Sequence, residues 1–135
     1  MRVRDLMTED VVSIRANEDL LMARELMWDH DIRHLPVVDD DNELIGLLSH
    51  RDLLQVTEKA ESSLPLSAQN DLLQSTRVEE MMVREVATTE PEEDIRRAAQ
   101  LMVENKFGCL PVVSGGRLAG IITESDFVRF LAEGD

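Results

Sequence analysis

The amino-acid sequence predicts an α+β fold made of two similar halves, and two observations lead to this prediction. Residues 7–38 align with residues 82–113 at a constant offset (82 − 7 = 75 and 113 − 38 = 75), which indicates an internal duplication. Each half also alternates short runs of β-branched residues with stretches whose apolar residues recur at helical spacing. The 135 residues suffice for two small half-domains that must pack on each other.

The elements of the first half follow from local patterns. Asn17 is a suitable N-cap, and the apolar residues after it fall on one face of a helix. Pro36 stands near the start of a short apolar run, where a strand tolerates it. In chain order we predict a strand at Val11–Ile14, a helix from about Glu18 to Asp29, a strand at Leu35–Val38, a turn at Asp39–Asn42, a returning strand at Leu44–Leu48 and a helix beginning just past Ser49.

The second half predicts the same order. Pro91 lies where a first helical turn tolerates it, and Ile95, Ala98, Ala99 and Met102 form the apolar stripe. Each half is then a small three-stranded sheet with helices on one face, and the two halves are expected to pack about a pseudo-two-fold axis. We predict repeat 1 at residues 1–56, a polar linker at 57–76 with a helical turn near Asp71, and repeat 2 at 77–135.

The composition narrows the function. The chain carries 28 acidic and 14 basic residues and a net charge of −14, a field that repels nucleic acid. Cys109 is the single cysteine, so no intrachain disulfide is expected. No run of residues resembles a signal peptide or reaches the length of a membrane span. We therefore expect a cytoplasmic protein without nucleic-acid or membrane partners.

One motif occurs twice, at Gly46–Asp52 and Gly120–Asp126: glycine, two aliphatic residues, a hydroxyl, two variable residues and aspartate. We call these two stretches the closing segments. A hydroxyl at a helix start and a carboxylate one turn later suit a ribose with a phosphate. The alternative interpretation is a helix cap, because Ser or Thr followed by Asp three residues later also satisfies a helix N-terminus.

The whole pattern resembles the tandem cystathionine β-synthase (CBS) domain, or Bateman module, as a stand-alone protein. The entry segment Val3–Met7, the Leu-Pro-Val-Val run and the closing segment occur in order in both copies, over nearly the whole chain outside the linker. The resemblance implies a regulatory module that binds AMP, ADP, ATP or S-adenosylmethionine, with magnesium as an option for ATP. It also implies a homodimer and an effector protein on a separate chain.

The resemblance further implies two clefts between the repeats, each with residues of both. One would combine Ser49, Arg51 and Asp52 with Ala87, Phe107, Gly108 and Cys109. The other would combine Thr123, Ser125 and Asp126 with Val12, Ile32, Arg33 and His34. The Ser/Thr, Arg, His and Asp side chains among these would contact ribose and phosphate, and the remainder adenine.

The two clefts differ in charge. Arg33 and His34 are interpreted as phosphate contacts, or alternatively as a solvated strand edge, whereas Glu124 would repel phosphate. His50 is interpreted as a surface helix residue, and Trp28 as a packing or subunit contact. Met22, Met27, Met81, Met82 and Met102 are interpreted as core residues.

Other functions find less support. The histidines lack a metal-ligand spacing, and Cys109 lacks an obvious base, so we expect no metal site and no catalytic residue. A nucleotide hydrolase would need a poised base or a metal cluster, so we do not expect an enzyme. The alternative from another class is a structural or protein-interaction CBS dimer that binds no ligand, against which the two intact aspartates argue. Asp on ribose is common to all adenosyl ligands, so the sequence leaves open which of them binds and whether one cleft or both are occupied.

Overall fold

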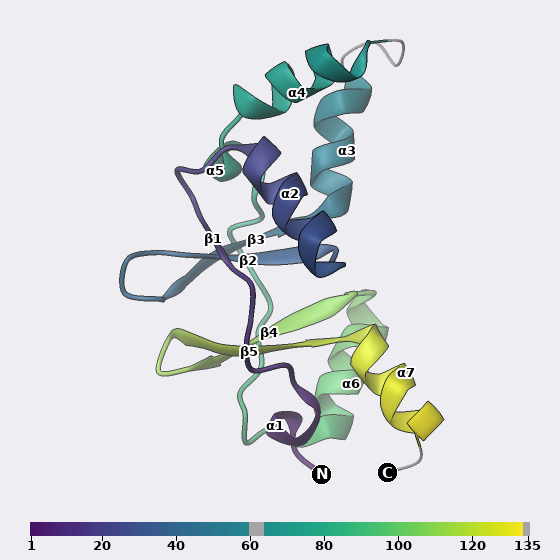
Figure 1. Ribbon diagram of the computed structural model, residues 1–135. Helices are drawn as coiled ribbons and strands as arrows, with labels where there is room; N and C mark the ends of the chain where they lie inside the picture. The colour runs from purple at the N-terminus through teal and green to yellow at the C-terminus, as the bar shows by residue number, and fades with distance from the viewer. Residues whose placement is uncertain (60–63, 134–135) are drawn as a thin grey trace. The chain divides into compact units, whose positions relative to one another are not determined.

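The computed structural model describes residues 1–59 and 64–133, and it confirms the predicted α+β class (Figure 1). The chain forms two compact units. The first-repeat unit contains residues 12–41 and 45–86, and the second-repeat unit contains residues 1–11, residues 42–44 and the chain from Ala87 onward. No helix in the described residues is long and apolar enough to cross a membrane.

The elements of the first-repeat unit are β1 (Ile14–Arg15), α2 (Leu20–His30), β2 (His34–Val38), β3 (Leu44–Ser49), α3 (His50–Lys59), α4 (Leu66–Gln74) and α5 (Val78–Met81). The elements of the second-repeat unit are α1 (Val3–Leu6), α6 (Ile95–Asn105), β4 (Cys109–Ser114), β5 (Arg117–Thr123) and α7 (Glu124–Glu133). The predicted order of strands and helices is therefore present in the first repeat. The second repeat departs from it in one place, because within the described residues its predicted first strand is reduced to a single bridge at Thr89 and its sheet has two strands rather than three.

The duplication is visible in the strand pairing. The first-repeat unit has a three-stranded sheet in the order β1-β2-β3, in which β1 runs parallel to β2 and Ile14 lies opposite Val37. In the second-repeat unit Thr89 forms a parallel bridge with Val112, at the same offset (14 + 75 = 89 and 37 + 75 = 112). There β4 and β5 form an antiparallel hairpin.

Each sheet is extended by a residue near the beginning of the other repeat. Thr8 forms an antiparallel bridge with Ile121, with N–H···O distances of 2.9 and 3.0 Å. Val83 forms the matching bridge with Leu47, with two bonds of 2.9 Å. The beginning of repeat 1 thus belongs to the second-repeat unit, and the beginning of repeat 2 belongs to the first-repeat unit.

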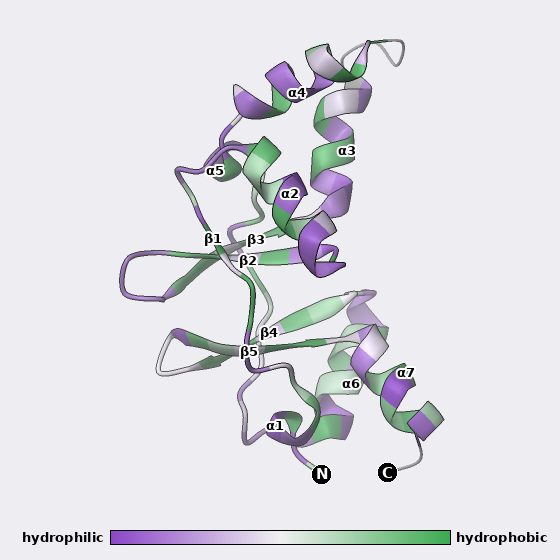
Figure 2. Ribbon diagram, in the orientation of Figure 1, coloured by the Kyte–Doolittle hydropathy of each residue, from purple (hydrophilic) through white to green (hydrophobic). Residues whose placement is uncertain are grey.

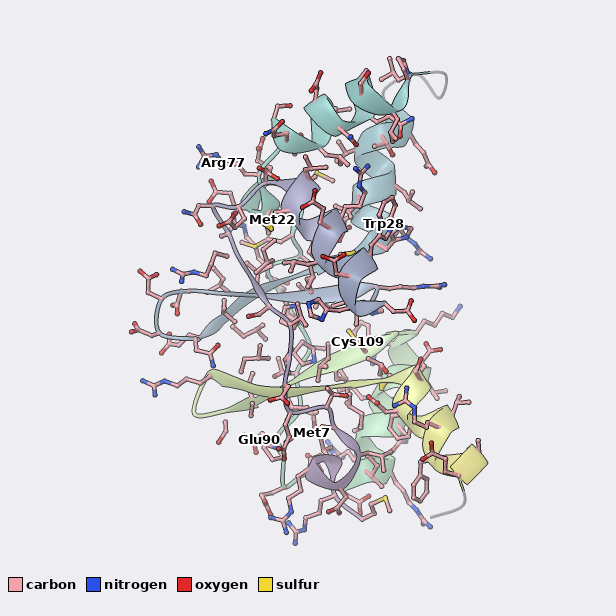
Figure 3. All side chains as sticks on the ribbon, in the orientation of Figure 1. Met7, Met22, Trp28, Arg77, Glu90 and Cys109 are labelled. Carbon is pink, nitrogen blue, oxygen red and sulfur yellow. The ribbon has the colours of Figure 1, made fainter. Side chains whose placement is uncertain are left out.

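This exchange explains the glycine of each closing segment. A Cβ atom on Gly46 would lie 2.6 Å from Met82 Sδ, and one on Gly120 would lie 2.9 Å from the backbone oxygen of Thr8. Met7, which Figure 3 labels beside α1, contributes a further atom at 2.8 Å from the Gly120 position. The crossing segment lies directly against the strand at both places, and the approach of backbone atoms is closer at Gly120 than at Gly46.

Each unit has its own apolar core. Figure 2 shows apolar residues along β2 and β4 and hydrophilic residues in the loop between β2 and β3. The buried residues that form the first-repeat core are Ile14, Leu20, Ala23, Met27, Leu35, Val37, Leu48, Leu53, Leu73, Val78 and Met82. Those of the second-repeat core are Val3, Ala98, Met102, Leu110, Val112 and Ile122.

The predicted helix start at Asn17 is wrong by two residues. Asp19 caps α2, and its side chain accepts a hydrogen bond from Met22 N–H at 2.9 Å. Asp94 caps α6 in the same way, with Arg96 N–H at 2.8 Å. The repeat contains the signal for this, since Asp occurs in both copies (19 + 75 = 94) whereas Asn17 aligns with Glu92.

The predicted first strand is also shorter and later than expected, because only Ile14 and Arg15 pair with β2. Met22, predicted in the core, is 42% exposed. It lies on the outer side of α2, since Leu20, Ala23 and Met27 form the buried face.

The stretch predicted as a polar linker is largely helical. The helix α3 extends to Lys59, and α4 adds nine residues where a single turn was predicted. Leu73 of α4 is buried in the first-repeat core, and Arg24 Nη2 of α2 donates to Asn70 Oδ1 at 2.5 Å. Packing on α2 and α3 therefore stabilises a helix whose polar composition suggested a linker. Residues 60–63, including the serines at 62 and 63, lie outside the described residues.

Candidate functional site

The closing segment of the first repeat brings together a hydroxyl, a carboxylate and a helix start. The backbone N–H of Ser49 donates to Asp52 Oδ2 at 2.7 Å, and the Ser49 hydroxyl donates to the same oxygen at 3.0 Å. Asp52 N–H donates back to Ser49 Oγ at 3.3 Å. This reciprocal pattern caps the N-terminus of α3.

The closing segment of the second repeat repeats the first two of these hydrogen bonds. Thr123 donates its backbone N–H to Asp126 Oδ2 at 2.8 Å and its hydroxyl to that oxygen at 3.2 Å. Asp126 is buried, at 7% exposure. Its other oxygen, Oδ1, accepts a hydrogen bond from Arg129 Nη1 at 3.4 Å.

Both closing segments therefore form the helix cap that was the alternative interpretation of the motif. The cap occupies one carboxylate oxygen in each repeat. Within residues 1–59 and 64–133, Asp52 Oδ1 accepts no hydrogen bond, whereas Asp126 Oδ1 is already engaged by Arg129. The first-repeat carboxylate thus keeps an acceptor for ligand hydroxyls in addition to its capping role.

A hollow of about 450 Å³ adjoins the first closing segment inside the first-repeat unit. Arg33 and His50 are brought together there by a backbone hydrogen bond of 2.8 Å from His50 N–H to the oxygen of Arg33. The hollow lies where α2 ends, β2 begins and α3 begins. Its lining residues are Met27, Trp28, Asp31, Ile32, Arg33 and His50.

The corresponding place in the second repeat has no cation at the positions of Arg33 and His50, although Lys106 stands at the position of Asp31 (31 + 75 = 106). Glu124 N–H donates to the oxygen of Gly108 at 3.1 Å, which repeats the bond between His50 and Arg33. Gly108 stands where repeat 1 has Arg33 (33 + 75 = 108), and Glu124 where it has His50 (50 + 74 = 124). An anionic group would therefore meet Arg33 and His50 at the first closing segment and Glu124 at the second, where Arg129 is paired with Asp126.

The predicted site residues divide evenly between the units. The first-repeat unit holds Val12, Ile32, Arg33, His34, Ser49, Arg51 and Asp52. The second-repeat unit holds Ala87, Phe107, Gly108, Cys109, Thr123, Ser125 and Asp126. Contacts within a unit thus bring the strand-entry residues of a repeat to the closing segment of the same repeat, while the predicted pairing across repeats stays a prediction.

Sequence reasoning missed three residues of the hollow. His50 was interpreted as a surface residue, yet it lines the hollow beside Arg33. Asp31 was not considered; it has φ 52° and ends α2. Trp28, labelled on α2 in Figure 3, is 67% exposed with the Arg24 guanidinium 5.0 Å from its ring centroid. Asp31 aligns with Lys106 of the second repeat (31 + 75 = 106), and this reversal of charge was the signal that could have identified Asp31.

Cys109 lies at the start of β4, opposite Thr123, and is buried at 4% exposure. Burial raises the pKa of its thiol from 9.0 to about 12, because an apolar environment disfavours the thiolate. The thiol is therefore protonated near neutral pH and unsuited to nucleophilic attack.

We expect iodoacetamide at pH 8.5 to alkylate Cys109 rapidly in the unfolded chain and at least about tenfold more slowly in the native protein. The reason is that burial lowers the fraction of Cys109 present as thiolate, which is the form that reacts. Stability should also fall as pH rises from about 9 toward 12, because only the unfolded chain loses the thiol proton in that window. Mass spectrometry of timed, quenched samples measures the alkylation rate. Equal rates in the native and unfolded protein would contradict the buried placement.

Comparison with solved structures places this architecture among proteins with CBS domain pairs. A putative acetoin utilization protein from Vibrio cholerae has a TM-score of 0.84 at 37% identity, with 98% of this chain and 91% of that chain covered. The CBS domain pair of protein MJ0100, in complex with 5′-methylthioadenosine and S-adenosyl-L-methionine, has a TM-score of 0.82 at 26% identity, covering 100% and 98%. CBSX2 in complex with AMP has a TM-score of 0.83 at 26% identity, covering 99% and 98%.

Sequence comparison agrees. The family model for the CBS domain matches residues 3–59 and 78–133. A protein of Methanocaldococcus jannaschii is 34% identical over 96% of this chain, and a homoserine O-acetyltransferase of Methanohalobium evestigatum is 30% identical over 97%. The chain spans 42% and 24% of the lengths of these two relatives. Hypoxic response protein 1 of Mycobacterium tuberculosis is 32% identical, over 96% of this chain and 85% of its own length.

Proposed function

Because the chain belongs to the CBS domain family, we propose that it is a regulatory module that binds an adenosyl ligand and passes the resulting conformational change to a partner protein. The ligand would be AMP, ADP, ATP or S-adenosylmethionine, with magnesium accompanying ATP. The single observation that carries the proposal is the closing segment of the first repeat, where a hydroxyl, a helix start and the Oδ1 acceptor of Asp52 lie together.

The chemistry of this segment suits a nucleoside. A carboxylate oxygen can accept hydrogen bonds from both ribose hydroxyls, and the start of α3 favours a negative group. Arg33 and His50 add basic side chains at the hollow beside it, and Arg51 is exposed on the first turn of α3. Two solved CBS pairs of similar fold carry adenosyl ligands, AMP in one and S-adenosyl-L-methionine with 5′-methylthioadenosine in the other.

The two repeats are expected to differ in affinity. Ligand hydroxyls at Asp126 would compete with Arg129 for Oδ1, and Glu124 would repel a phosphate. We therefore assign the working site to the first closing segment, where Asp52 Oδ1 and the basic side chains remain for the ligand.

Regulation rather than catalysis is the role that fits this chemistry. A ligand shifts a protein only through different affinities for two arrangements of it. The described residues contain no group of three or more His, Cys, Asp or Glu that could hold a metal ion, and the burial of Cys109 keeps its thiol protonated.

We further propose that the protein forms a homodimer through its helices. Exposed apolar residues recur at equivalent positions of the two repeats: Trp28 and Val103 on α2 and α6 (28 + 75 = 103), and Leu54 and Val128 on α3 and α7 (54 + 74 = 128). A second copy would bury these residues, and removing apolar surface from water lowers the free energy of the dimer. Light scattering of the wild type and of a Trp28→Glu, Val128→Glu variant tests this; two equal monomer masses would contradict it.

The experiment that tests ligand binding is thermal unfolding with AMP, ADP, ATP, S-adenosylmethionine or no ligand. A ligand at about 100 times its dissociation constant stabilises the native state by roughly 2.7 kcal/mol, which raises Tm by several degrees. We expect at least one adenosyl ligand to produce this rise. A Tm that no ligand changes would favour the alternative, a structural or protein-interaction dimer.

A further inference from the structure

The hollow beside the first closing segment contains two opposite charges that the protein does not pair. Asp31 and Arg33 are among its lining residues, and both are exposed. Within residues 1–59 and 64–133, neither side chain has a hydrogen-bond or ion-pair partner. A molecule in the hollow would therefore meet one negative and one positive group, with the apolar side chains of Met27, Trp28 and Ile32 around them.

Both charges also oppose the helix ends at which they lie. Asp31 is the C-cap of α2, where its backbone N–H donates to the oxygens of Met27 and Trp28, and a helix C-terminus favours a cation. The backbone oxygen of Arg33 accepts the hydrogen bond of His50, the first residue of α3, and a helix N-terminus favours an anion. Helix capping therefore does not account for the charge of either residue.

The second repeat shows that the backbone does not require this arrangement. Lys106 ends α6 in the same left-handed conformation as Asp31 (31 + 75 = 106), with φ 57° against 52°. Glu124 begins α7 at the position of His50, and Gly108 replaces Arg33. There the charges agree with the helix ends. Local departures from such rules are typical of functional positions.

We propose that the hollow of the first repeat binds an α-amino-carboxylate group. Its ammonium would lie at Asp31 and the C-terminal end of α2, and its carboxylate at Arg33, His50 and the start of α3. The carbon chain attached to it would contact Met27 and Ile32. A volume of about 450 Å³ is sufficient for such a group.

This group can come from two sources. One is the aminoacyl tail of an adenosyl ligand such as S-adenosylmethionine, and in that form the inference rests on the proposed function, since His50 directly follows Ser49 of the closing segment. The other is a free amino acid such as methionine. A polyphosphate fits less well than an aminoacyl tail. Asp31 would repel the negative charges of a polyphosphate, whereas it would attract the ammonium group of the tail.

Calorimetric titration with three compounds separates these sources. S-adenosylhomocysteine and 5′-methylthioadenosine share the adenosyl thioether and differ in the aminoacyl tail, so the ratio of their affinities measures the tail alone. Methionine measures the free amino acid. The variants are Asp31→Asn, which suits the left-handed conformation, and Arg33→Gln, with Lys106→Gln as the matched control in the other repeat.

We expect S-adenosylhomocysteine to bind at least about tenfold more tightly than 5′-methylthioadenosine, because charge-assisted hydrogen bonds at both ends of the tail are stronger than neutral ones. The ratio should approach one in Asp31→Asn and in Arg33→Gln and stay unchanged in Lys106→Gln. Without ligand, Asp31→Asn should have a slightly higher Tm than the wild type, which also shows that the variant folds.

The outcomes are distinguishable. Binding of methionine that the Asp31 and Arg33 variants lose, without binding of either adenosyl compound, would support the free amino acid and reject the adenosyl function. Equal affinities for the two adenosyl compounds and no binding of methionine would overturn this inference and leave the adenosyl function in place. No binding of any of the three, or an affinity ratio that the Asp31 and Arg33 variants do not change, would also overturn it.

Discussion

Replacement of Gly120 by alanine is expected to destabilise the protein by about 1–3 kcal/mol, the usual cost of forcing a side chain into a packed site. The new Cβ would lie 2.9 Å from the backbone oxygen of Thr8 and 2.8 Å from Met7 Sδ. Because Thr8 is held by two hydrogen bonds to Ile121, the backbone oxygen cannot move without breaking the bridge. Urea unfolding followed by circular dichroism measures the change.

The matched variant is Gly46→Ala in the first repeat. The nearest atom there is Met82 Sδ, at the flexible end of a side chain, and the backbone oxygen of Val83 lies farther away at 3.1 Å. A smaller loss of stability is expected for Gly46→Ala than for Gly120→Ala. Equal and negligible losses in the two variants would contradict the crossing of residues 7–8 over β5.

Replacement of Asp126 by alanine is expected to cost about 2–3 kcal/mol, because it removes a helix cap and leaves buried polar groups without an acceptor. The carboxylate accepts the backbone N–H and the hydroxyl of Thr123 and lies at 7% exposure. The loss should appear as a lower urea midpoint with an unchanged slope.

Two variants separate the contributions at Asp126. Asp52→Ala removes the same cap from a more exposed position and should cost about 1 kcal/mol, the typical value for a cap. Arg129→Ala removes a partner that is 60% exposed and should change stability by less than about 0.5 kcal/mol, since exposed ion pairs contribute little. A larger loss for Arg129→Ala than for Asp126→Ala would show that the cap is not the main contribution.

The sequence was sufficient to predict the local elements of both repeats. The apolar run Leu35–Val38 and the apolar stripes with Met27 and Met102 correspond to a buried strand and to the buried faces of two helices. Such signals are local, so a single sequence contains them. The helix α4 was underestimated because its stability comes from Leu73 and Asn70 packing on other helices rather than from its own composition.

The exchange of segments between the repeats was not predictable. Thr8 pairs with Ile121, more than a hundred residues away (121 − 8 = 113), and no local pattern names the partner of a single bridging residue. The sequence shows that the glycine recurs in both closing segments, but its contacts with Met7 and Met82 required the structure. The hydroxyls and aspartates of the closing segments were predicted as site residues, and the structure adds that they cap their helices.

The roles of Asp31 and His50 depended on the fold in the same way. The two residues are 19 positions apart (50 − 31 = 19) and line one hollow because β2 and β3 return the chain to the end of α2. Comparison of the two repeats would have shown that the charges at these positions are reversed, but not that Asp31 and His50 line the same hollow.

The central claim is that an adenosyl ligand binds at the first closing segment, and calorimetric titration with AMP and S-adenosylmethionine tests it most directly. We expect saturable binding of at least one of them to the wild type. Binding should weaken at least about tenfold in Asp52→Ala, since two hydrogen bonds to a carboxylate are lost, and change much less in Asp126→Ala. Absence of binding by both ligands, or binding that Asp52→Ala leaves unchanged, would contradict the claim.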